Sequence, residues 1–124
     1  MSYCIELDHE HHLIRQTASD IFTEHQSWEA IGRIRAMAEF PDYGLVLDFR
    51  PARRLALSCD HLEHLARRIG TEIPVCARAL VVNEKDRETA ELFARAACRG
   101  FESVRLFDDL EDAVFWAGRV PVAA

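Results

Sequence analysis

Short apolar runs alternate with longer segments of helical periodicity through most of this chain. The runs are GLVLDF, ARALVVN and SVRLF, at 44–49, 77–83 and 103–107. Their continuous apolar character, bounded by turn residues, is typical of strands that are covered on both faces. Parallel strands joined through helices need crossovers, which are almost always right-handed. The alternation therefore predicts an α/β fold with a largely parallel sheet.

The first eighteen residues follow a different pattern. Tyr3, Ile5 and Leu7 recur at every second position, as in a half-buried strand, and a second strand-like run extends from His12 to Ala18. The polar stretch DHEHH lies between them. We expect Asp8 to His11 to form the turn, since Asp favours turns, and His12 to begin the returning strand. These residues predict an antiparallel hairpin.

Four helices are expected between and after the strands. Thr23 and Gln26 have capping-box spacing at the start of the first helix, which Phe40-Pro41 should end. The second helix is expected from Ser58 to Ile69, with Gly70 as its stop. A third helix over 84–100 closes at Gly100, and Asp109 can cap the last one.

The predicted order is therefore β-β-α-β-α-β-α-β-α, a five-stranded mixed sheet with four helices. The segment RPARRLAL, 50–57, is expected to be a loop between the central strand and the second helix. The 124 residues, of which 49% are hydrophobic, are enough for one core, so we expect a single domain over 1–124.

Charge and hydropathy limit the classes of partner. The net charge of −6 repels phosphate backbones, so no nucleic-acid partner is expected. No apolar run approaches the roughly 20 residues that span a bilayer, and the N-terminus does not resemble a signal peptide. These features predict a cytoplasmic protein without a membrane span. The four cysteines, Cys4, Cys59, Cys76 and Cys98, form no CxxC pair and are expected to be reduced and mostly buried.

Several segments together resemble the STAS domain, in particular its SpoIIAA-like branch of small bacterial proteins. The residues that carry the resemblance are IELDHEHHLIRQTAS, FTEHQSWEAI, LVLDFR and FDDLEDAVFWAG, the last with Ala113 and Trp116 three apart. The resemblance covers nearly the whole chain and implies the same fold that the alternation of elements predicts.

The resemblance also implies a candidate regulatory residue. STAS proteins of the anti-sigma-factor-antagonist type carry a phosphorylatable serine in an Asp-Ser-Ser-Gly-like turn, where the helix after the central strand begins. Here the longer segment DFRPARRLALSCDHL replaces that turn, and Ser58 is the hydroxyl near the helix start. Ser58 is therefore either a phosphosite, favoured by the helix N-terminus, or an ordinary N-cap.

Cationic and polar residues follow the central strands, where ligands of parallel sheets usually bind. These candidates for binding a partner or an anion are Arg50, Arg53, Arg54, Ser58, Asn83 and Lys85. Three guanidiniums can hold a carboxylate, a phosphate or an acidic protein surface. The alternative is a solvated loop whose arginines pair with nearby acids.

Motifs for catalysis or for a metal are weaker. Cys59 lies near a helix start, where a thiolate is favoured, but His61 is too close along the helix to face it. His61 and His64 offer only two metal ligands where zinc takes at least three, and His9 and His11 offer two more in the turn. We expect no metal, no cofactor and no catalytic residue.

The sequence thus predicts a non-enzymatic regulatory or binding module of STAS-like type that acts through protein contacts. Its protein partner is unidentified, and assembly as a homodimer stays open. A first alternative is a carrier of a small apolar or anionic ligand, because the related CRAL-TRIO fold holds an apolar ligand between helices and sheet. A second alternative is a thiol enzyme that uses Cys59.

Overall fold

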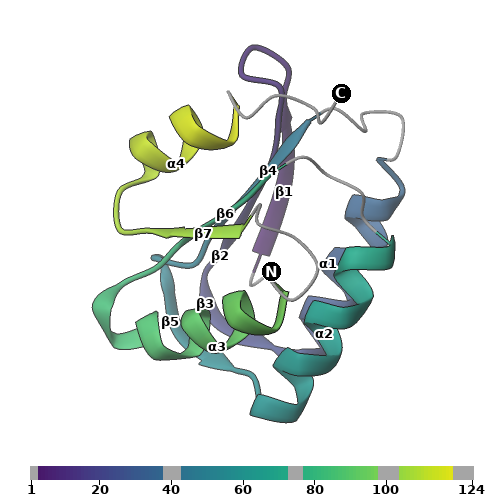
Figure 1. Ribbon diagram of the computed structural model, residues 1–124, viewed down its shortest axis with the longest axis vertical. Helices are drawn as coiled ribbons and strands as arrows, with labels where there is room; N and C mark the ends of the chain where they lie inside the picture. The colour runs from purple at the N-terminus through teal and green to yellow at the C-terminus, as the bar shows by residue number, and fades with distance from the viewer. Residues whose placement is uncertain (1–2, 38–42, 73–76, 98–103, 119–124) are drawn as a thin grey trace.

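A five-stranded mixed sheet forms the centre of the molecule (Figure 1). The computed structural model describes residues 3–37, 43–72, 77–97 and 104–118. The strand order is β1-β2-β4-β6-β7, where β1 and β2 form the predicted antiparallel hairpin and the other neighbours are parallel. The bounds are β1 Tyr3–Asp8, β2 Leu13–Ala18, β4 Gly44–Asp48, β6 Arg78–Val81 and β7 Val104–Phe107.

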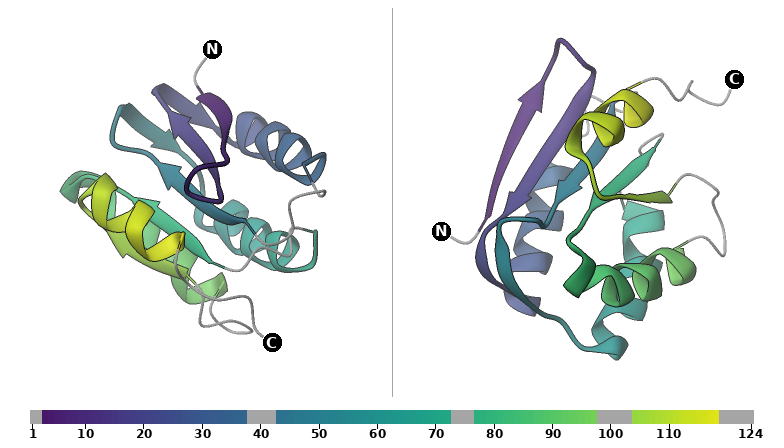
Figure 2. Two further views of the ribbon diagram at one scale, coloured as in Figure 1. Left: turned by 90° about the horizontal axis from the view of Figure 1, so that it is seen from above. Right: turned by 90° about the vertical axis from the view of Figure 1, so that its left-hand side faces the viewer.

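Helices cover both faces of this sheet (Figure 2). Three of them lie on one face and α4 lies on the other: α1 Glu24–Arg35, α2 Cys59–Glu72, α3 Arg87–Ala97 and α4 Leu110–Ala117. A single 3-10 turn, η1 Glu84–Asp86, precedes α3. None of the helices in the described ranges is long and apolar enough to cross a membrane. The predicted mixed α/β sheet with four helices is therefore confirmed.

The two faces of β4 explain why its sequence is continuously apolar. All five residues of β4 are buried. Leu45 and Leu47 belong to the larger core under α1, α2 and α3, whereas Val46 packs in the smaller core under α4 with Ala113 and others. A strand that packs against helices on both faces has no polar side, as the apolar run predicted.

The predicted starts of α1 and α4 are confirmed by their caps. The N–H of Gln26 donates to Thr23 Oγ1 at 3.2 Å and the N–H of Thr23 donates to Gln26 Oε1 at 3.1 Å, which completes the capping box of α1. At α4, the N–H of Glu111 donates to Asp109 Oδ1 at 2.9 Å. The expected stops at Phe40-Pro41 and Gly100 lie outside the described residues.

The prediction of a loop over 50–57 was wrong. Ala52–Ala56 form β5, which pairs in parallel with β3, Asp20–Thr23, as a second, two-stranded sheet. The β5 sequence ARRLA places two exposed arginines side by side, so it lacks the apolar alternation of a strand. Its partner begins at Asp20, whose φ of 53° turns the chain sharply after β2.

Several element boundaries differ from the prediction, among them the start of α3, which begins at Arg87 after the 3-10 turn and not at Glu84. His12 has a φ of 55° and belongs to the turn, so the returning strand begins at Leu13 and not at His12. The helix α2 continues past Gly70 to Glu72. A glycine inside a helix costs only about 1 kcal/mol relative to alanine, so the rest of a helix can carry it through.

The expectation that the cysteines are mostly buried was wrong for the two that the structure describes. Cys4 and Cys59 are both exposed, free thiols. Cys4 lies on the edge strand β1, on the face opposite the buried Tyr3, and Cys59 is the first residue of α2. Cys76 and Cys98 lie outside the described residues.

Candidate functional site

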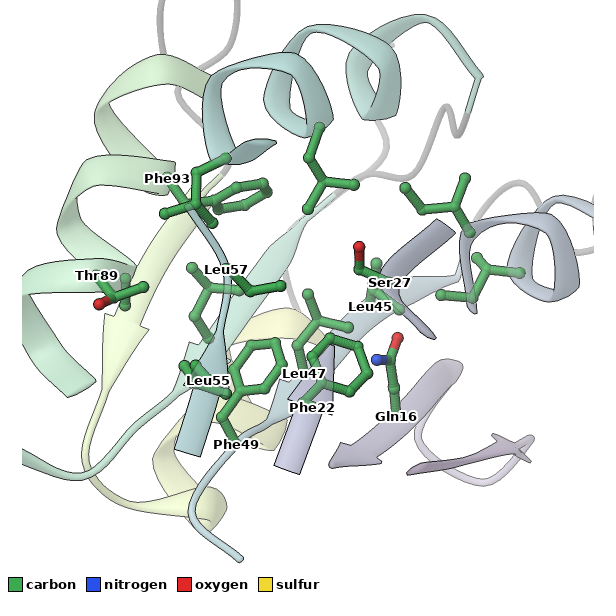
Figure 3. A pocket seen from close by; sticks show the side chains of 16 residues that line it. Gln16, Phe22, Ser27, Leu45, Leu47, Phe49, Leu55, Leu57, Thr89 and Phe93 are labelled. Carbon is green, nitrogen blue, oxygen red and sulfur yellow. The ribbon is translucent and has the colours of Figure 1, made fainter. Parts of the chain in front are cut away.

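An apolar cavity lies between the sheet and the helices α1, α2 and α3 (Figure 3). Its volume is about 60 Å³. The apolar side chains that line it come from the sheet, from the small sheet of β3 and β5, and from all three helices: Phe22, Ile31, Ile34, Leu45, Leu47, Phe49, Leu55, Leu57, Leu62, Leu65, Leu80, Ala90 and Phe93. The strands β3 and β5, which the sequence did not reveal, thus contribute part of its wall.

Among the described residues that line this cavity, three have polar side chains and none is charged. The three are Gln16 on β2, Ser27 on α1 and Thr89 on α3. Gln16 and Ser27 are buried, with 5% and 4% of their surface exposed. A site of this composition favours an apolar molecule and disfavours an ion, whose hydration nothing in the lining replaces.

Ser27 also belongs to a polar contact between α1 and α2. Its Oγ lies 2.6 Å from His61 Nε2 and donates to the carbonyl of Glu24 at 2.7 Å. The hydroxyl has a single hydrogen, so when it donates to Glu24 it accepts from the N–H of His61. Because that proton is held by a backbone carbonyl, this serine is placed as a structural link and not as an activated nucleophile.

The imidazole of His61 is buried at the same interface. Burial lowers the pKa of His61, nearby Glu24 raises it to a lesser extent, and His64 lowers it. The Nδ1 of His61 lies 3.9 Å from Glu24 Oε2. The ring is therefore favoured in its neutral form, in which one nitrogen donates and the other accepts.

His61 and His64 do not form a metal pair. Each ring meets the edge or face of Trp28, with centroids 5.3 Å and 5.4 Å from that of the indole. In the described ranges no three histidine, cysteine, aspartate or glutamate side chains are grouped for a metal. The two histidines instead join Trp28 in the contact between α1 and α2.

Two of the candidates predicted from the sequence, Asn83 and Lys85, contact the segment that contains the arginines. The amide of Asn83 donates to the carbonyl of Arg50 at 2.8 Å, and Lys85 Nζ donates to the carbonyls of Ala52 and Arg53 at 3.1 Å and 2.8 Å. Asn83 and Lys85 thus hold the backbone of the 50–53 segment. Lys85 also pairs with Asp86 at 3.0 Å.

The three arginines of this segment differ in what they contact. Arg50 donates to both carboxylate oxygens of Asp48, each at 3.0 Å, and these hydrogen bonds raise the pKa of Arg50. Arg53 is exposed and its Nε lies 3.5 Å from Asp20 Oδ1. Arg54 is exposed on β5. Arg50 is partly buried and paired with Asp48, whereas Arg53 and Arg54 are the more exposed arginines of this segment.

Ser58 lies apart from the arginines, at the start of α2. Its Oγ accepts from the N–H of His61 at 3.1 Å, which is the N-cap contact, and its hydroxyl donates to Glu24 Oε1 at 2.9 Å. The backbone N–H of Ser58 also donates to Glu24 Oε1, at 3.3 Å, and the two hydrogen bonds from Ser58 lower the pKa of Glu24. Ser58 therefore joins the N-terminal ends of α1 and α2 in its unmodified form.

The other sequence candidates are separated by the fold. Cys59 is exposed, while the ring of His61 is turned toward Ser27, so these two do not form a thiol–imidazole pair. In the hairpin turn, His11 Nδ1 lies 2.8 Å from Asp8 Oδ2, whereas His9 Nδ1 lies 2.7 Å from the hydroxyl of Tyr43. His9 and His11 thus diverge instead of converging on one ligand.

Sequence reasoning missed the cavity and its polar residues. One signal was present: Ile14, Gln16 and Ala18 share a face of β2, so the period of two places a polar amide among buried apolar residues. The contact between Ser27 and His61 left no such signal, because the two residues are 34 positions apart and lie on separate helices.

Of the comparisons with known proteins, the one with solved structures bears on the fold. No protein-family model and no curated protein matches the chain. A crystal structure from Shewanella loihica PV-4, described as an uncharacterized protein from the DUF3478 family with a SpoIIAA-like fold, is similar over 94% of both chains, with a TM-score of 0.65 and 15% identity. The chain therefore has a SpoIIAA-like fold, as the resemblance to STAS domains implied.

Proposed function

We propose that this protein is a non-enzymatic binding module of STAS-like type that takes a small, largely apolar molecule into the cavity between α1, α2, α3 and the sheet. The observation that carries the proposal is the lining, in which thirteen of the sixteen described side chains are apolar and none of the sixteen is charged. Such a lining binds by removing apolar surface from water.

The size of the cavity limits the ligand. Its 60 Å³ is well below the roughly 150 Å³ that accommodates benzene in an engineered protein cavity. The cavity as described therefore accepts a molecule of a few non-hydrogen atoms, and a larger ligand requires α2 or α3 to move away from the sheet. At a ceiling of about 1.5 kcal/mol per non-hydrogen atom, binding of such a molecule is weak.

Xenon under pressure tests this proposal, because it is apolar and probes the cavity without polar contacts. We expect methyl resonances of Leu47, Leu57 and Leu80, which line the cavity, to shift in NMR spectra as xenon is added. Native mass spectrometry of freshly purified protein adds a second measurement, namely a bound mass that is lost on denaturation. An absence of xenon shifts at these methyl groups would contradict the proposal.

A matched pair of variants separates the cavity from the rest of the core. Ala90→Val adds two carbons to a residue that lines the cavity, whereas Ala96→Val adds them on the same helix outside it. We expect Ala90→Val to abolish the xenon shifts and Ala96→Val to retain them. Equal shifts in both variants would locate xenon elsewhere.

A second candidate function is a contact with an acidic protein surface through Arg53 and Arg54, which the sequence placed on a loop and which lie on β5. Arg53 and Arg54 are adjacent, exposed guanidiniums, and Lys85 holds the backbone on which they stand. This arrangement supports ion pairing with a partner, since Arg50 is already engaged with Asp48.

Capture from a lysate, read by mass spectrometry, tests this second candidate. We expect the double variant Arg53→Ala/Arg54→Ala to lose a partner that the unmodified protein captures. The control is Arg67→Ala/Arg95→Ala, which removes the same charge from exposed positions on α2 and α3. If both double variants capture the partner equally well, the β5 arginines are not its binding site.

A further inference from the structure

We propose that Gln16 is the polar contact for the ligand of the cavity and that this ligand is a neutral molecule with a short apolar body and one hydroxyl or carbonyl group. The inference rests on the proposed function, because it names the class of ligand for the same cavity. It rests in addition on the position and hydrogen bonding of one buried amide.

Gln16 lies on an inner strand of the sheet. It lies on β2 between Ile5 of β1 and Leu47 of β4, and 5% of its surface is exposed. The side chain lines the cavity, and Figure 3 shows its amide extending from β2 into that space. The residues on the same face of β2, Ile14 and Ala18, are buried and apolar.

The amide of Gln16 has hydrogen-bonding capacity that the protein leaves unused. No residue in the described part of the chain forms a hydrogen bond with this side chain. An unpaired amide at a buried position is less favourable than an apolar side chain of the same size. A ligand that offers a hydroxyl or a carbonyl group to this amide supplies the missing hydrogen bond.

The other polar lining residues do not provide an equivalent contact. The hydroxyl of Ser27 is occupied by the carbonyl of Glu24 and by the ring of His61. Thr89 lies across the cavity from Gln16, at the side formed by α3 (Figure 3). Gln16 is thus the buried polar group that remains available to a bound molecule.

The absence of charge from the lining selects a neutral ligand. A carboxylate or phosphate in this cavity would lose its hydration, and no lining side chain in the described part of the chain carries a positive charge to replace it. The amide of glutamine both donates and accepts, so it matches a hydroxyl or a carbonyl group. Short alcohols and ketones combine this group with a body small enough for the cavity.

NMR titration of the whole chain tests the inference with 2-propanol as the polar probe and xenon as the apolar probe. The side-chain NH₂ resonances of Gln16 are identified by their disappearance in Gln16→Met, a variant of similar length without the amide. We expect 2-propanol to shift these resonances more than xenon does. We also expect Gln16→Met to weaken 2-propanol binding about tenfold, the loss of one hydrogen bond, and to leave xenon binding unchanged.

The matched control is Thr17→Val, which removes a hydroxyl from the adjacent residue on the opposite face of β2. This variant should bind both probes as the unmodified protein does. If Gln16→Met binds 2-propanol as tightly as the unmodified protein while xenon still binds, the role of Gln16 is overturned and the apolar site stands. If neither probe binds the unmodified protein, the proposed function fails as well.

The amide resonances decide the matter even if Gln16→Met does not fold. They are then assigned by through-bond correlation in the unmodified protein. A shift specific to 2-propanol supports the hydrogen bond, whereas equal shifts with 2-propanol and xenon overturn it.

Discussion

The Oγ of Ser27 and the Nε2 of His61 lie 2.6 Å apart across the interface between α1 and α2. Both residues are buried, and Ser27 also lines the apolar cavity. This hydrogen bond therefore connects the packing of the two helices with the wall of the candidate site. Glu24 and Ser58 extend the polar contact to the N-terminal ends of the same helices.

Replacing Ser27 by alanine should destabilise the protein. The change leaves a nitrogen of the buried His61 without its partner, and an unsatisfied buried polar group costs about 1–3 kcal/mol. The free energy of unfolding, measured with urea, checks this value. The double variant Ser27→Ala/His61→Leu should lose less than the sum of the two single variants, and strictly additive losses would show that the hydrogen bond does not contribute.

The burial of His61 predicts that stability depends on pH below neutrality. Its pKa in the folded protein is lowered from 6.5, mainly by burial, so the unfolded chain binds more protons in the interval between the two values. The free energy of unfolding should therefore fall as the pH falls from about 6.5 through the pKa of His61 in the folded protein. Above pH 6.5 the titration of His61 should not change it. Urea unfolding at a series of pH values measures this slope.

Two histidine variants assign the pH slope to its source. His61→Gln should flatten it, because the group that titrates is removed. His25→Gln, at a side chain that is 87% exposed, should leave it unchanged. An identical slope in the unmodified protein and in His61→Gln would show that His61 is not the source of the pH dependence.

A negative charge at residue 58 should be repelled by the carboxylate of Glu24 and should therefore destabilise the protein. Ser58→Ala removes the N-cap of α2 and should cost about 0.5–2 kcal/mol. Ser58→Asp keeps a capping oxygen but places a carboxylate beside that of Glu24, which accepts the serine hydroxyl in the unmodified protein. Phosphorylation of Ser58 would introduce the same repulsion at larger charge.

A double-mutant cycle isolates this repulsion. Glu24→Gln should lower the stability of the unmodified protein, because it weakens the hydrogen bond from Ser58, and raise the stability of Ser58→Asp. The effect of Glu24→Gln on the free energy of unfolding, measured with urea, should thus have opposite signs in the unmodified protein and in Ser58→Asp. The same sign in both backgrounds would show that residues 24 and 58 do not interact through charge.

The two glycines Gly44 and Gly32 should respond to alanine in opposite directions. A Cβ at Gly44, the first residue of β4, would lie 2.5 Å from the carbonyl oxygen of Ala117 on α4. Because that oxygen is backbone, strand and helix must separate, at a cost of about 1–3 kcal/mol. At Gly32, inside α1, nothing lies within 4 Å of the new Cβ, so Gly32→Ala should stabilise by about 0.5–1 kcal/mol. Melting temperatures measure both effects, and a harmless Gly44→Ala would show that α4 is not held tightly against β4.

Local signals explain which parts of the fold could be predicted. The hairpin, the caps of α1 and α4 and the buried strand β4 depend on residues close together in the chain, such as Thr23 and Gln26. The strand β5 could not be predicted, because Arg53 and Arg54 hide its pattern and its partner β3 lies about thirty positions earlier.

The candidate site was predictable only in part, for a related reason. The sequence placed Arg50, Asn83 and Lys85 at neighbouring strand ends, and these residues do contact the same segment. It did not show that Asp48 engages the guanidinium of Arg50, or that Ser58 lies against Glu24 on another helix. Side-chain partners depend on which surfaces meet, and that information is not local.

The sequence by itself determined the hairpin, the five strands of the mixed sheet and the helices between them, because hydrophobic periodicity and capping act over a few residues. Only the tertiary structure decided where the cavity lies, since its wall combines β3, β5 and three helices that are distant along the chain. It also decided that Gln16 faces this cavity without a hydrogen-bond partner among the described residues and that Ser27 contacts His61. Such contacts arise when separate elements bury their apolar faces together, and each element alone contains only one side of them.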